Sequence, residues 1–465
     1  MLPSRFLVVV FISFAVLLSL ASITAAQTVS TLFSFTGLPA VSAPSGPLTQ
    51  GRDGLLYGTS LAGGILNLGT VYKISTSGSG DIVYTFEQVH GANPYLGVML
   101  ATDGRLYTTT PLGGAGGFGV VDQISKSGVA TLLHDFTGGY DEREPWGAPV
   151  EASDGNLYGA VNGGSVEPGA VYKLTTSGIF STIHNFTGYD GFSPQSSLIQ
   201  AADGKLYGTT YGTTNVGGAN CGTIVKLTLS GTGKAAYTFP CDSGGANPSA
   251  PLVQATDGNF YGTTLYGGTD GEGTIFKMTE QGVVSIVHSF GEVSQDGASP
   301  NMSLVQGTDG NLYGVTQSGG NGYGTIFQMS LSGDYKVLYA FTLSEQNANP
   351  AGGLIQHTNG LFYGTTAGGF LSDPHGTVYS LDMGLGPFVA FVIPIGKVGK
   401  SAQILGQGLT GTTSVTFNGV EAASFKVVSD TYMTAVVPSG ATTGPVVVTT
   451  PTQTLTSNKN FRISQ

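Results

Sequence analysis

The sequence predicts an all-β fold in which one four-stranded unit is repeated seven times and a smaller β-domain follows. First, a Pro stands nine positions ahead of an Asp-Gly or Asn-Gly pair in seven copies, spaced about fifty residues apart. Second, a hydrophobic residue and a Tyr follow each pair. Third, Gly accounts for 74 of 465 residues and charged residues for only 10%, a composition suited to strands and turns. Short apolar runs and Gly-rich turns at such a fixed period are typical of a seven-bladed β-propeller. The pairs are Pro44/Asp53, Pro94/Asp103, Pro145/Asp154, Pro194/Asp203, Pro248/Asp257, Pro300/Asp309 and Pro350/Asn359, and the tyrosines are Tyr57, Tyr107, Tyr158, Tyr207, Tyr261, Tyr313 and Tyr363.

Residues 1–26 are predicted to be a signal peptide. Arg5 supplies positive charge, the apolar stretch from Phe6 to Leu20 follows, and small residues lead to Ala26, after which cleavage would occur. The alternative is an uncleaved membrane anchor, for which the apolar run is short. We therefore expect a secreted or cell-surface protein, periplasmic or extracellular, with no membrane span after cleavage.

The fifth copy illustrates how one repeat forms one blade. Pro251–Ala255 is predicted as strand a, Asn259–Thr264 as strand b, Gly273–Met278 as strand c and Val283–Phe290 as strand d. Asp-Gly between strands a and b is a strong hairpin signal, because both central residues of a type I′ turn need positive φ.

The first strand d precedes every other strand of the repeat. Thr31–Phe35 carries the strand-d pattern, whereas the last copy ends after strand c at Asp382. We therefore expect residues 27–384 to form one ring in which the N-terminal strand completes the last blade. Such closure removes the open sheet edges that invite aggregation.

The repeat resembles a known bacterial family. The unit Asp-Gly-x-Leu-Tyr-Gly-Thr-Thr, Gly-Gly and Gly-Thr-Val-Tyr-Lys is similar to the GloVer (Gloeo/Verruco) tandem repeat of exported proteins. The resemblance implies a repeat architecture and no particular activity. One copy departs from the pattern twice, with Thr108 in place of Gly and Val121-Asp122 in place of Val-Tyr.

Residues 385–465 no longer follow the repeat. Short predicted strands separated by turn signals indicate a small β-sandwich. The segment resembles the IPT/TIG domain, which implies an immunoglobulin-like fold with a spacer or adhesion role. The residues that carry this resemblance are Gly396, Gly399, Gly406, Gly408, Phe417, Gly419, Phe425, Ser429, Val437, Pro438, Gly444 and Phe461.

The two cysteines are predicted to form a disulfide. Cys221 opens strand c of the fourth blade and Cys241 closes its strand d, so a hairpin centred on Gly231 would place them opposite each other. The bond would tie the long loop around Thr213–Asn220 to the next connection. Two free buried thiols are the alternative.

No metal or cofactor is expected. His134, His184 and His288 occupy a position where other blades carry Tyr or Phe, which indicates packing. The Asp of each Asp-Gly pair stands alone at a tight turn, and Asn359 replaces it once, whereas calcium requires several oxygen ligands.

The candidate binding site lies on the face that carries the b–c and d–a loops. Variable loops on a rigid scaffold are common binding sites. The residue after the repeat Pro changes from blade to blade, and Trp146, the only Trp, follows the acidic residues Asp141, Glu142 and Glu144. An aromatic platform beside acids and amides suits a sugar ring or a cationic group, although Trp146 would otherwise pack between two blades. The candidate ligand-binding residues are Trp146, Tyr95, Glu144, Gln195 and Asn301.

These observations favour a non-catalytic binding or adhesion protein that recognises a glycan or a surface protein. The alternatives are a propeller enzyme, a glycan hydrolase or lyase with its site in the central channel, and a structural surface scaffold. The net charge of −11 without a basic cluster disfavours nucleic acid. We expect a monomer. The sequence contains no recognised catalytic motif, and it does not identify the ligand, the means of anchoring or any catalytic residue.

Overall fold

The structure is a computed structural model that describes residues 27–35, 41–139, 143–163, 168–212, 221–342, 348–368 and 375–464. The predicted signal peptide, the acidic residues Asp141 and Glu142, and the loop Thr213–Asn220 lie outside the described residues. Within the described part the chain is all-β apart from one 3-10 turn, η1 (Gln88–His90). None of its helices is long and apolar enough to span a membrane.

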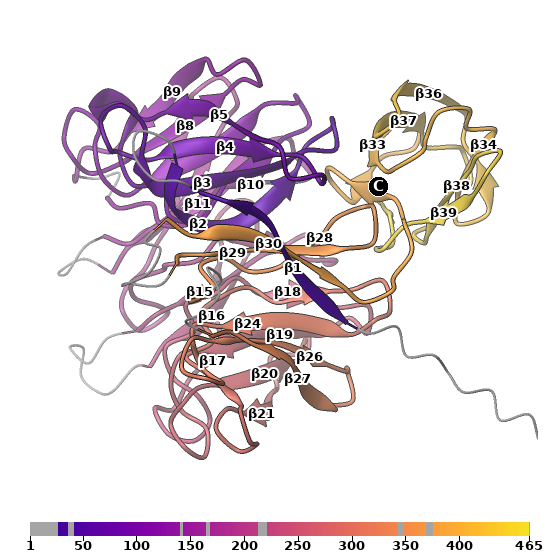
Figure 1. Cartoon of the computed structure of the whole chain (residues 1–465). Helices are drawn as coiled ribbons and strands as arrows, with labels where there is room; N and C mark the ends of the chain where they lie inside the picture. The colour runs from indigo at the N-terminus through magenta and orange to yellow at the C-terminus, as the bar shows by residue number, and fades with distance from the viewer. Residues whose placement is uncertain are drawn as a thin grey trace, which may run out of the picture.

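Residues 28–382 form seven four-stranded antiparallel sheets in a β-propeller-like arrangement (Figure 1). Strands a to d of a sheet follow each other along the chain, as predicted. The first three sheets are β2–β5 (Val41–Gln50, Leu56–Gly63, Thr70–Ile74, Gly80–Thr85), β6–β9 (Met99–Leu100, Leu106–Thr110, Val120–Ile124, Ala130–Asp135) and β10–β13 (Val150–Glu151, Leu157–Val161, Ala170–Leu174, Phe180–Asn185).

The next three sheets repeat this pattern, and the sixth is accompanied by a short extra ribbon. They are β14–β17 (Ile199–Gln200, Leu206–Thr210, Thr223–Leu227, Gly233–Thr238), β18–β21 (Val253–Gln254, Phe260–Thr264, Thr274–Met278, Val284–Ser289) and β23-β24-β26-β27 (Val305–Gln306, Leu312–Thr316, Thr325–Met329, Tyr335–Ala340). The ribbon pairs β22 (Gly297–Ala298) with β25 (Ser318–Gly319).

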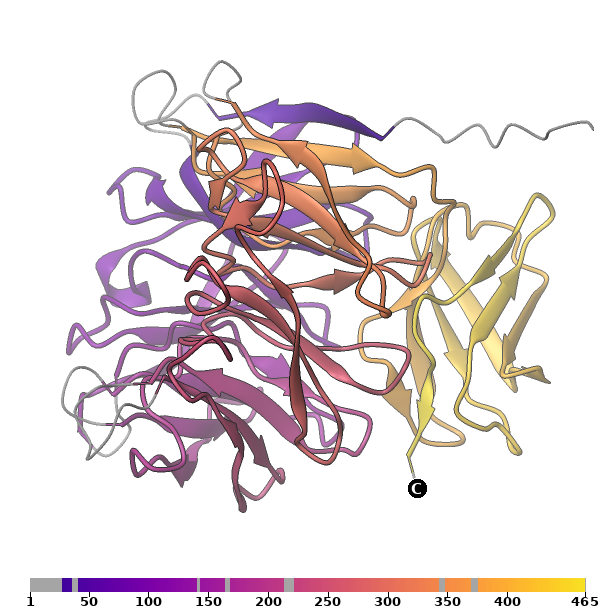
Figure 2. The same cartoon turned by 90° about the horizontal axis from the view of Figure 1, so that it is seen from below.

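The seventh sheet joins the two ends of the repeat region. Its strands a to c are β28 (Ile355–Gln356), β29 (Phe362–Thr366) and β30 (Thr377–Asp382), and the N-terminal strand β1 (Thr28–Ser34) pairs antiparallel with β30. This is the pairing expected from the out-of-phase strand pattern. Figures 1 and 2 show β1, in indigo, beside the orange strands of the last repeat.

The hydrophobic core is divided among the junctions between neighbouring sheets. Each of seven buried clusters packs one sheet on the next; for example, Tyr107 and Val121 pack with Leu157 and Tyr172. The clusters include one in which the seventh sheet, through Tyr363 and Val378, packs on the first. The seam is therefore built like every other junction.

The side chain at the end of strand a bridges neighbouring sheets at the a–b turns. Gln254 accepts a hydrogen bond from the Ala202 amide at 2.7 Å, and Gln306 accepts one from the Thr256 amide at 2.9 Å. At the seam Gln50 accepts a hydrogen bond from the Thr358 amide at 3.0 Å. The other bridges come from Glu151, Gln200 and Gln356, and Leu100 occupies the equivalent position at the remaining junction.

The two departures in the second repeat compensate each other. In the third sheet Gly159 lies opposite Tyr172. A Cβ at Gly159 would lie 2.3 Å from the tyrosine oxygen, so the Tyr172 side chain requires Gly at position 159. In the second sheet Thr108 lies opposite Asp122. Because the Asp122 side chain is smaller than that of Tyr172 at the equivalent position, Thr108 fits at the position that is otherwise Gly.

The C-terminal module consists of two four-stranded sheets around one core. The first sheet is β31-β33-β37-β36 (Ala390–Phe391, Ser401–Leu405, Tyr432–Val436, Ser424–Ser429) and the second is β35-β34-β38-β39 (Val420–Glu421, Ser414–Phe417, Val446–Thr449, Thr454–Thr456). A short parallel pair, β32 (Ile395–Gly396) and β40 (Arg462–Ile463), adds to it.

This module packs against the a–b turns at one end of the ring, as both views show (Figures 1 and 2). Arg52 Nη2 donates hydrogen bonds to the Thr102 carbonyl and to Gln403 Oε1, both at 2.6 Å, and the guanidinium lies 4.8 Å from the centre of the Tyr432 ring. Arg52 is in the turn next to Leu100, so the junction without a Gln or Glu bridge takes part in the docking.

Further contacts extend the interface across the ring. Gln407 Nε2 donates to Thr358 Oγ1 at 3.0 Å, next to the seam, and Arg462 donates to the Ala201 carbonyl of the fourth sheet. Because the first and fourth sheets lie on opposite sides of the ring, the module lies across its axis.

Candidate functional site

The candidate site is a pocket at the end of the ring opposite the module. It has a volume of about 590 Å³, within the ~300–1,000 Å³ typical of small-molecule sites. Four of the five predicted residues line it: Tyr95, Trp146, Gln195 and Asn301. Two smaller cavities, of about 300 and 380 Å³, lie between the ring and the module.

A repeated backbone feature accompanies the residue after each repeat Pro, and that residue lines the pocket in all seven copies. The residue before the Pro has φ between 51° and 59° in all seven copies, although none of the seven is Gly. This left-handed conformation costs about 1 kcal/mol for a non-Gly residue, and its regular recurrence indicates that the architecture requires it. The residues are Ala43, Asn93, Glu144, Ser193, Asn247, Ser299 and Asn349.

A second set of lining residues was not predicted. Four of these residues directly follow strand b, and the fifth lies near the end of β3; Tyr211, for example, donates its amide hydrogen to the carbonyl of the left-handed Ser193 at 3.0 Å. Their variation between repeats is visible in the sequence and could have identified them. They are Leu61, Tyr211, Leu265, Gln317 and Ala367. Burial raises the pKa of Tyr211, so its hydroxyl stays protonated at neutral pH.

The two aromatic residues of the site touch each other. The ring centres of Tyr95 and Trp146 are 4.8 Å apart, with planes inclined by 59°. Tyr95 is 39% exposed and Trp146 is partly buried, so together they offer an apolar wall on the second and third sheets. Trp146 thus both contacts its neighbour and lines the pocket.

Glu144 is placed differently from the other four predicted residues. It occupies the left-handed position before Pro145, and its carboxylate accepts a hydrogen bond from Asn162 Nδ2 at 3.4 Å. It is not among the residues that line the pocket. The lining, as far as the structure describes it, contains no Asp, Glu, Lys, Arg or His.

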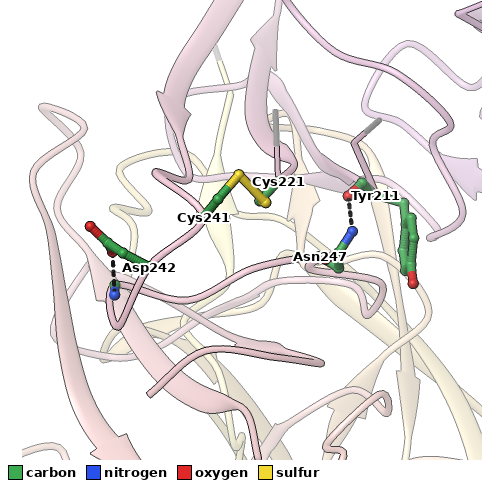
Figure 3. Close-up of a disulfide and its surroundings, with 6 residues drawn as sticks. Tyr211, Cys221, Cys241, Asp242 and Asn247 are labelled. Atoms are coloured by element: carbon green, nitrogen blue, oxygen red, sulfur yellow. Dashed lines mark hydrogen bonds between the residues drawn. A yellow bond between two sulfur atoms is a disulfide. The ribbon is translucent and has the colours of Figure 1, made fainter. Parts of the chain in front are cut away.

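The predicted disulfide is present, and Figure 3 shows it near Asn247 and Tyr211, of which Tyr211 lines the pocket. The Cα atoms of Cys221 and Cys241 are 5.1 Å apart. Asn247 links this bond to the lining, because its amide hydrogen reaches the Cys221 carbonyl at 2.6 Å and its Nδ2 donates to the Tyr211 carbonyl at 2.8 Å. The disulfide therefore supports the wall that carries Tyr211.

The histidines serve the structure of the blades. His134 stacks on Phe180 with ring centres 3.7 Å apart. His184 and His288 also make hydrogen bonds that the sequence did not predict, to Asp190 at 2.9 Å and to Asp296 at 3.1 Å. Burial raises the pKa of both aspartates, but hydrogen bonds outweigh it and hold each pKa below its ordinary value.

The Asp-Gly acids are used in their own hairpins. The Asp257 carboxylate accepts hydrogen bonds from the Asn259 amide at 3.0 Å and from the Tyr261 hydroxyl at 2.9 Å. In the last repeat the direction reverses, and Asn359 Nδ2 donates to the Tyr363 hydroxyl at 2.9 Å. Among the described residues no three His, Cys, Asp or Glu side chains are grouped as a metal site would require.

Comparison with known protein families identifies the family of the repeat. The family model of the Gloeobacter/Verrucomicrobia repeat matches residues 19–213 and 209–427. The chain belongs to this family. Membership confirms the resemblance seen in the repeat unit and, as that resemblance implied, assigns no activity. No curated protein matches the chain.

Solved structures similar to this Gloeobacter/Verrucomicrobia repeat protein share its fold at low identity. The extracellular domain of a protein assigned as a hybrid two-component system of B. thetaiotaomicron matches with a TM-score of 0.52 and 13% identity, over 93% of this chain and 46% of that one. A protein assigned as a gluconolactonase matches with a TM-score of 0.42 and 10% identity, over 78% of this chain and 94% of that one. Only the first likeness is close enough to support the fold, and neither bears on activity.

Proposed function

We propose that this chain is an exported, non-catalytic binding protein that recognises a glycan or a surface protein through the pocket beside Trp146. The observation that carries the proposal is the convergence of Tyr95, Trp146, Gln195 and Asn301, from the loops of four different repeats, on one pocket of about 590 Å³. A mostly apolar concave surface with a few polar groups is the usual character of a ligand site.

The architecture proposed with this function has two domains. Residues 27–384 form one seven-bladed propeller, a reading supported by the seven junction clusters and by the pairing of β1 with β30. Residues 385–465 form an immunoglobulin-like module of the IPT/TIG type, a reading supported by two four-stranded sheets around one core. The protein acts as a monomer.

Binding is preferred to catalysis because of the chemistry of the lining. A glycan hydrolase typically needs two carboxylic acids beside the scissile bond, and acid–base catalysis in general needs a group that titrates near neutral pH. In the described lining the titratable side chains are Tyr95 and Tyr211. The two tyrosines provide contact surface and hydroxyls.

An extracellular or periplasmic location fits the Cys221–Cys241 disulfide, since such bonds persist in oxidising compartments. The apolar segment before residue 27 would act as the export signal.

The test is a binding screen of the protein without residues 1–26 against oligosaccharides and surface-protein preparations, with turnover monitored in the same samples. Trp146→Ala should weaken the observed binding by about 2 kcal/mol, roughly thirtyfold, as expected for an aromatic anchor. Tyr189→Ala is the matched control, because Tyr189 is an aromatic residue 79% exposed outside the lining. Equal affinity of Trp146→Ala and wild type would refute the site, and turnover of a bound oligosaccharide would replace binding by catalysis.

A further inference from the structure

Three polar atoms of the pocket residues are buried without a hydrogen-bond partner among the described residues. They are Trp146 Nε1, Ser249 Oγ and Asn301 Oδ1. All three residues line the same pocket and occupy the same position in their repeats, directly after the Pro. Buried polar atoms usually have partners, although residues outside the pocket, such as Tyr72 and Thr263, also carry unpartnered atoms. What distinguishes these three atoms is that their residues line one pocket. None of the three atoms is exposed in this structure, so a ligand can satisfy them only after their side chains turn toward it.

The orphan atoms need a ligand that both donates and accepts hydrogen bonds. The indole Nε1 of Trp146 only donates, the amide oxygen of Asn301 only accepts, and the hydroxyl of Ser249 does either. The other end of the Asn301 amide is already used, since Nδ2 donates to Gln317 Oε1 at 3.1 Å. A hydroxyl group matches all three atoms.

The positions of these residues around the ring give the ligand an orientation. Tyr95 and Trp146 belong to the second and third repeats, whereas Ser249 and Asn301 belong to the fifth and sixth, across the pocket. The aromatic wall therefore faces a polar wall. Between Asn301 and Tyr95 lie Ala351 and Ser45, so the position after the repeat Pro carries only small side chains on that side of the pocket.

The lining also constrains the charge of the ligand. With no Asp, Glu, Lys, Arg or His in the described lining, nothing there compensates a carboxylate, a phosphate or an ammonium group. Removing such a group from water without a partner is costly. A cationic ligand, one of the options raised by the sequence, is disfavoured for this reason.

We infer that the pocket binds an uncharged sugar ring, which lies against Tyr95 and Trp146. Its hydroxyl groups reach Trp146 Nε1, Ser249 Oγ and Asn301 Oδ1 when these side chains turn toward the ligand. This inference rests on the proposed binding function and adds the ligand class. A flat apolar sugar face suits the aromatic wall, and the ring's hydroxyls suit the orphan atoms. The side of the pocket with the small residues Ala351 and Ser45 accommodates the next sugar of a short chain.

The experiment compares two sets of probes by calorimetry or fluorescence. The uncharged set contains cello-, manno-, malto-, xylo- and N-acetylchito-oligosaccharides, and the charged set contains oligogalacturonate, alginate oligosaccharides and chitosan oligosaccharides. Trp146→Phe keeps an aromatic face but removes the N–H, and Ser249→Ala removes the hydroxyl. Each should lower affinity for the bound uncharged probe roughly five- to tenfold, the effect of one hydrogen bond. Ala351→Trp should reduce binding of the longer chains more than that of the monosaccharide.

The control variant is Ser303→Ala, which removes a hydroxyl three residues after Pro300, the repeat Pro before Asn301, but outside the lining. Thermal unfolding of each variant checks that it is folded. Binding of charged probes in preference to uncharged ones, or binding that Trp146→Phe and Ser249→Ala leave unchanged, would overturn the inference. So would failure of every sugar to bind at millimolar concentration. In that case Trp146-dependent binding of a surface protein would leave the proposed function standing, whereas its absence would remove both.

Discussion

Replacing Gln50 by Leu tests whether the amide bridges stabilise the closed ring at its seam. Gln50 is 6% exposed; its Oε1 accepts a hydrogen bond from the Thr358 amide at 3.0 Å, and its Nε2 donates to Thr358 Oγ1 at 2.7 Å. Leu has a similar size and already occupies the equivalent position at Leu100, so the packing should be preserved. What is lost is the polar connection between the seventh and first sheets.

The size of the effect follows from the burial of Thr358, whose exposure is 0%. Leaving its amide hydrogen without an acceptor costs about 1–3 kcal/mol. The Thr358 hydroxyl loses less, because Gln407 Nε2 still donates to it at 3.0 Å. We therefore expect Gln50→Leu to lower the free energy of unfolding by about 2–3 kcal/mol.

The assay is urea unfolding with the disulfide intact, followed by fluorescence of Trp146 and by circular dichroism. Gln306→Leu is the matched variant, because it removes an equivalent bridge to Thr256 at a junction inside the chain. Both variants should lose a similar amount of stability. If Gln50→Leu unfolds within about 0.5 kcal/mol of wild type while Gln306→Leu is destabilised, the bridge across the seam is not formed as described.

Three further predictions concern the disulfide, the N-terminal strand and a buried carboxylate. Because 20 residues separate Cys221 from Cys241, replacing both by Ser should destabilise the protein by about 3 kcal/mol, measured by thermal unfolding; an unchanged midpoint would contradict this. Deleting residues 27–34 removes β1 and leaves β30 as an open edge, so the variant should associate into dimers or aggregates in size-exclusion chromatography, and a stable monomer would count against the closure. Burial raises the pKa of Asp122 from 3.8 to about 6 despite its hydrogen bond with His90, so Asp122 should contribute a gain in stability as the pH falls from 7 to 4, against an opposite contribution from His357, whose pKa is lowered by burial. Asp122→Asn should remove that gain and be more stable at pH 7 by up to about 3 kcal/mol; an unchanged pH profile would refute the assignment.

Much of the fold was predictable because the repeat carries it redundantly. The spacing of Pro, Asp-Gly and Tyr predicted strands and turns in every copy, and the out-of-phase strand pattern predicted that β1 pairs with β30. The disulfide followed from simple hairpin symmetry about Gly231. Such features depend on local chemistry and register, which a single sequence contains.

The contacts between sheets were not predicted, because they join residues about fifty positions apart through side chains whose direction the sequence does not give. The bridge from Gln254 to Ala202 and the docking of Arg52 on Gln403 and Tyr432 belong to this class. The candidate site was predicted only in part, because it also combines residues from different repeats. Variation after the repeat Pro indicated Trp146 and its equivalents. The left-handed conformation of the residue before the Pro, which is Glu144 in the third repeat, was not predicted, because Ala, Asn, Glu and Ser all occupy that position.

The docking of the C-terminal module leaves the candidate pocket uncovered. Arg52, Thr358 and Ala201 contact the module at the turn side of the ring, and none of these three residues lines the pocket beside Trp146. A ligand and the module therefore use different surfaces of the ring. A partner that holds the module would leave the pocket free for its ligand.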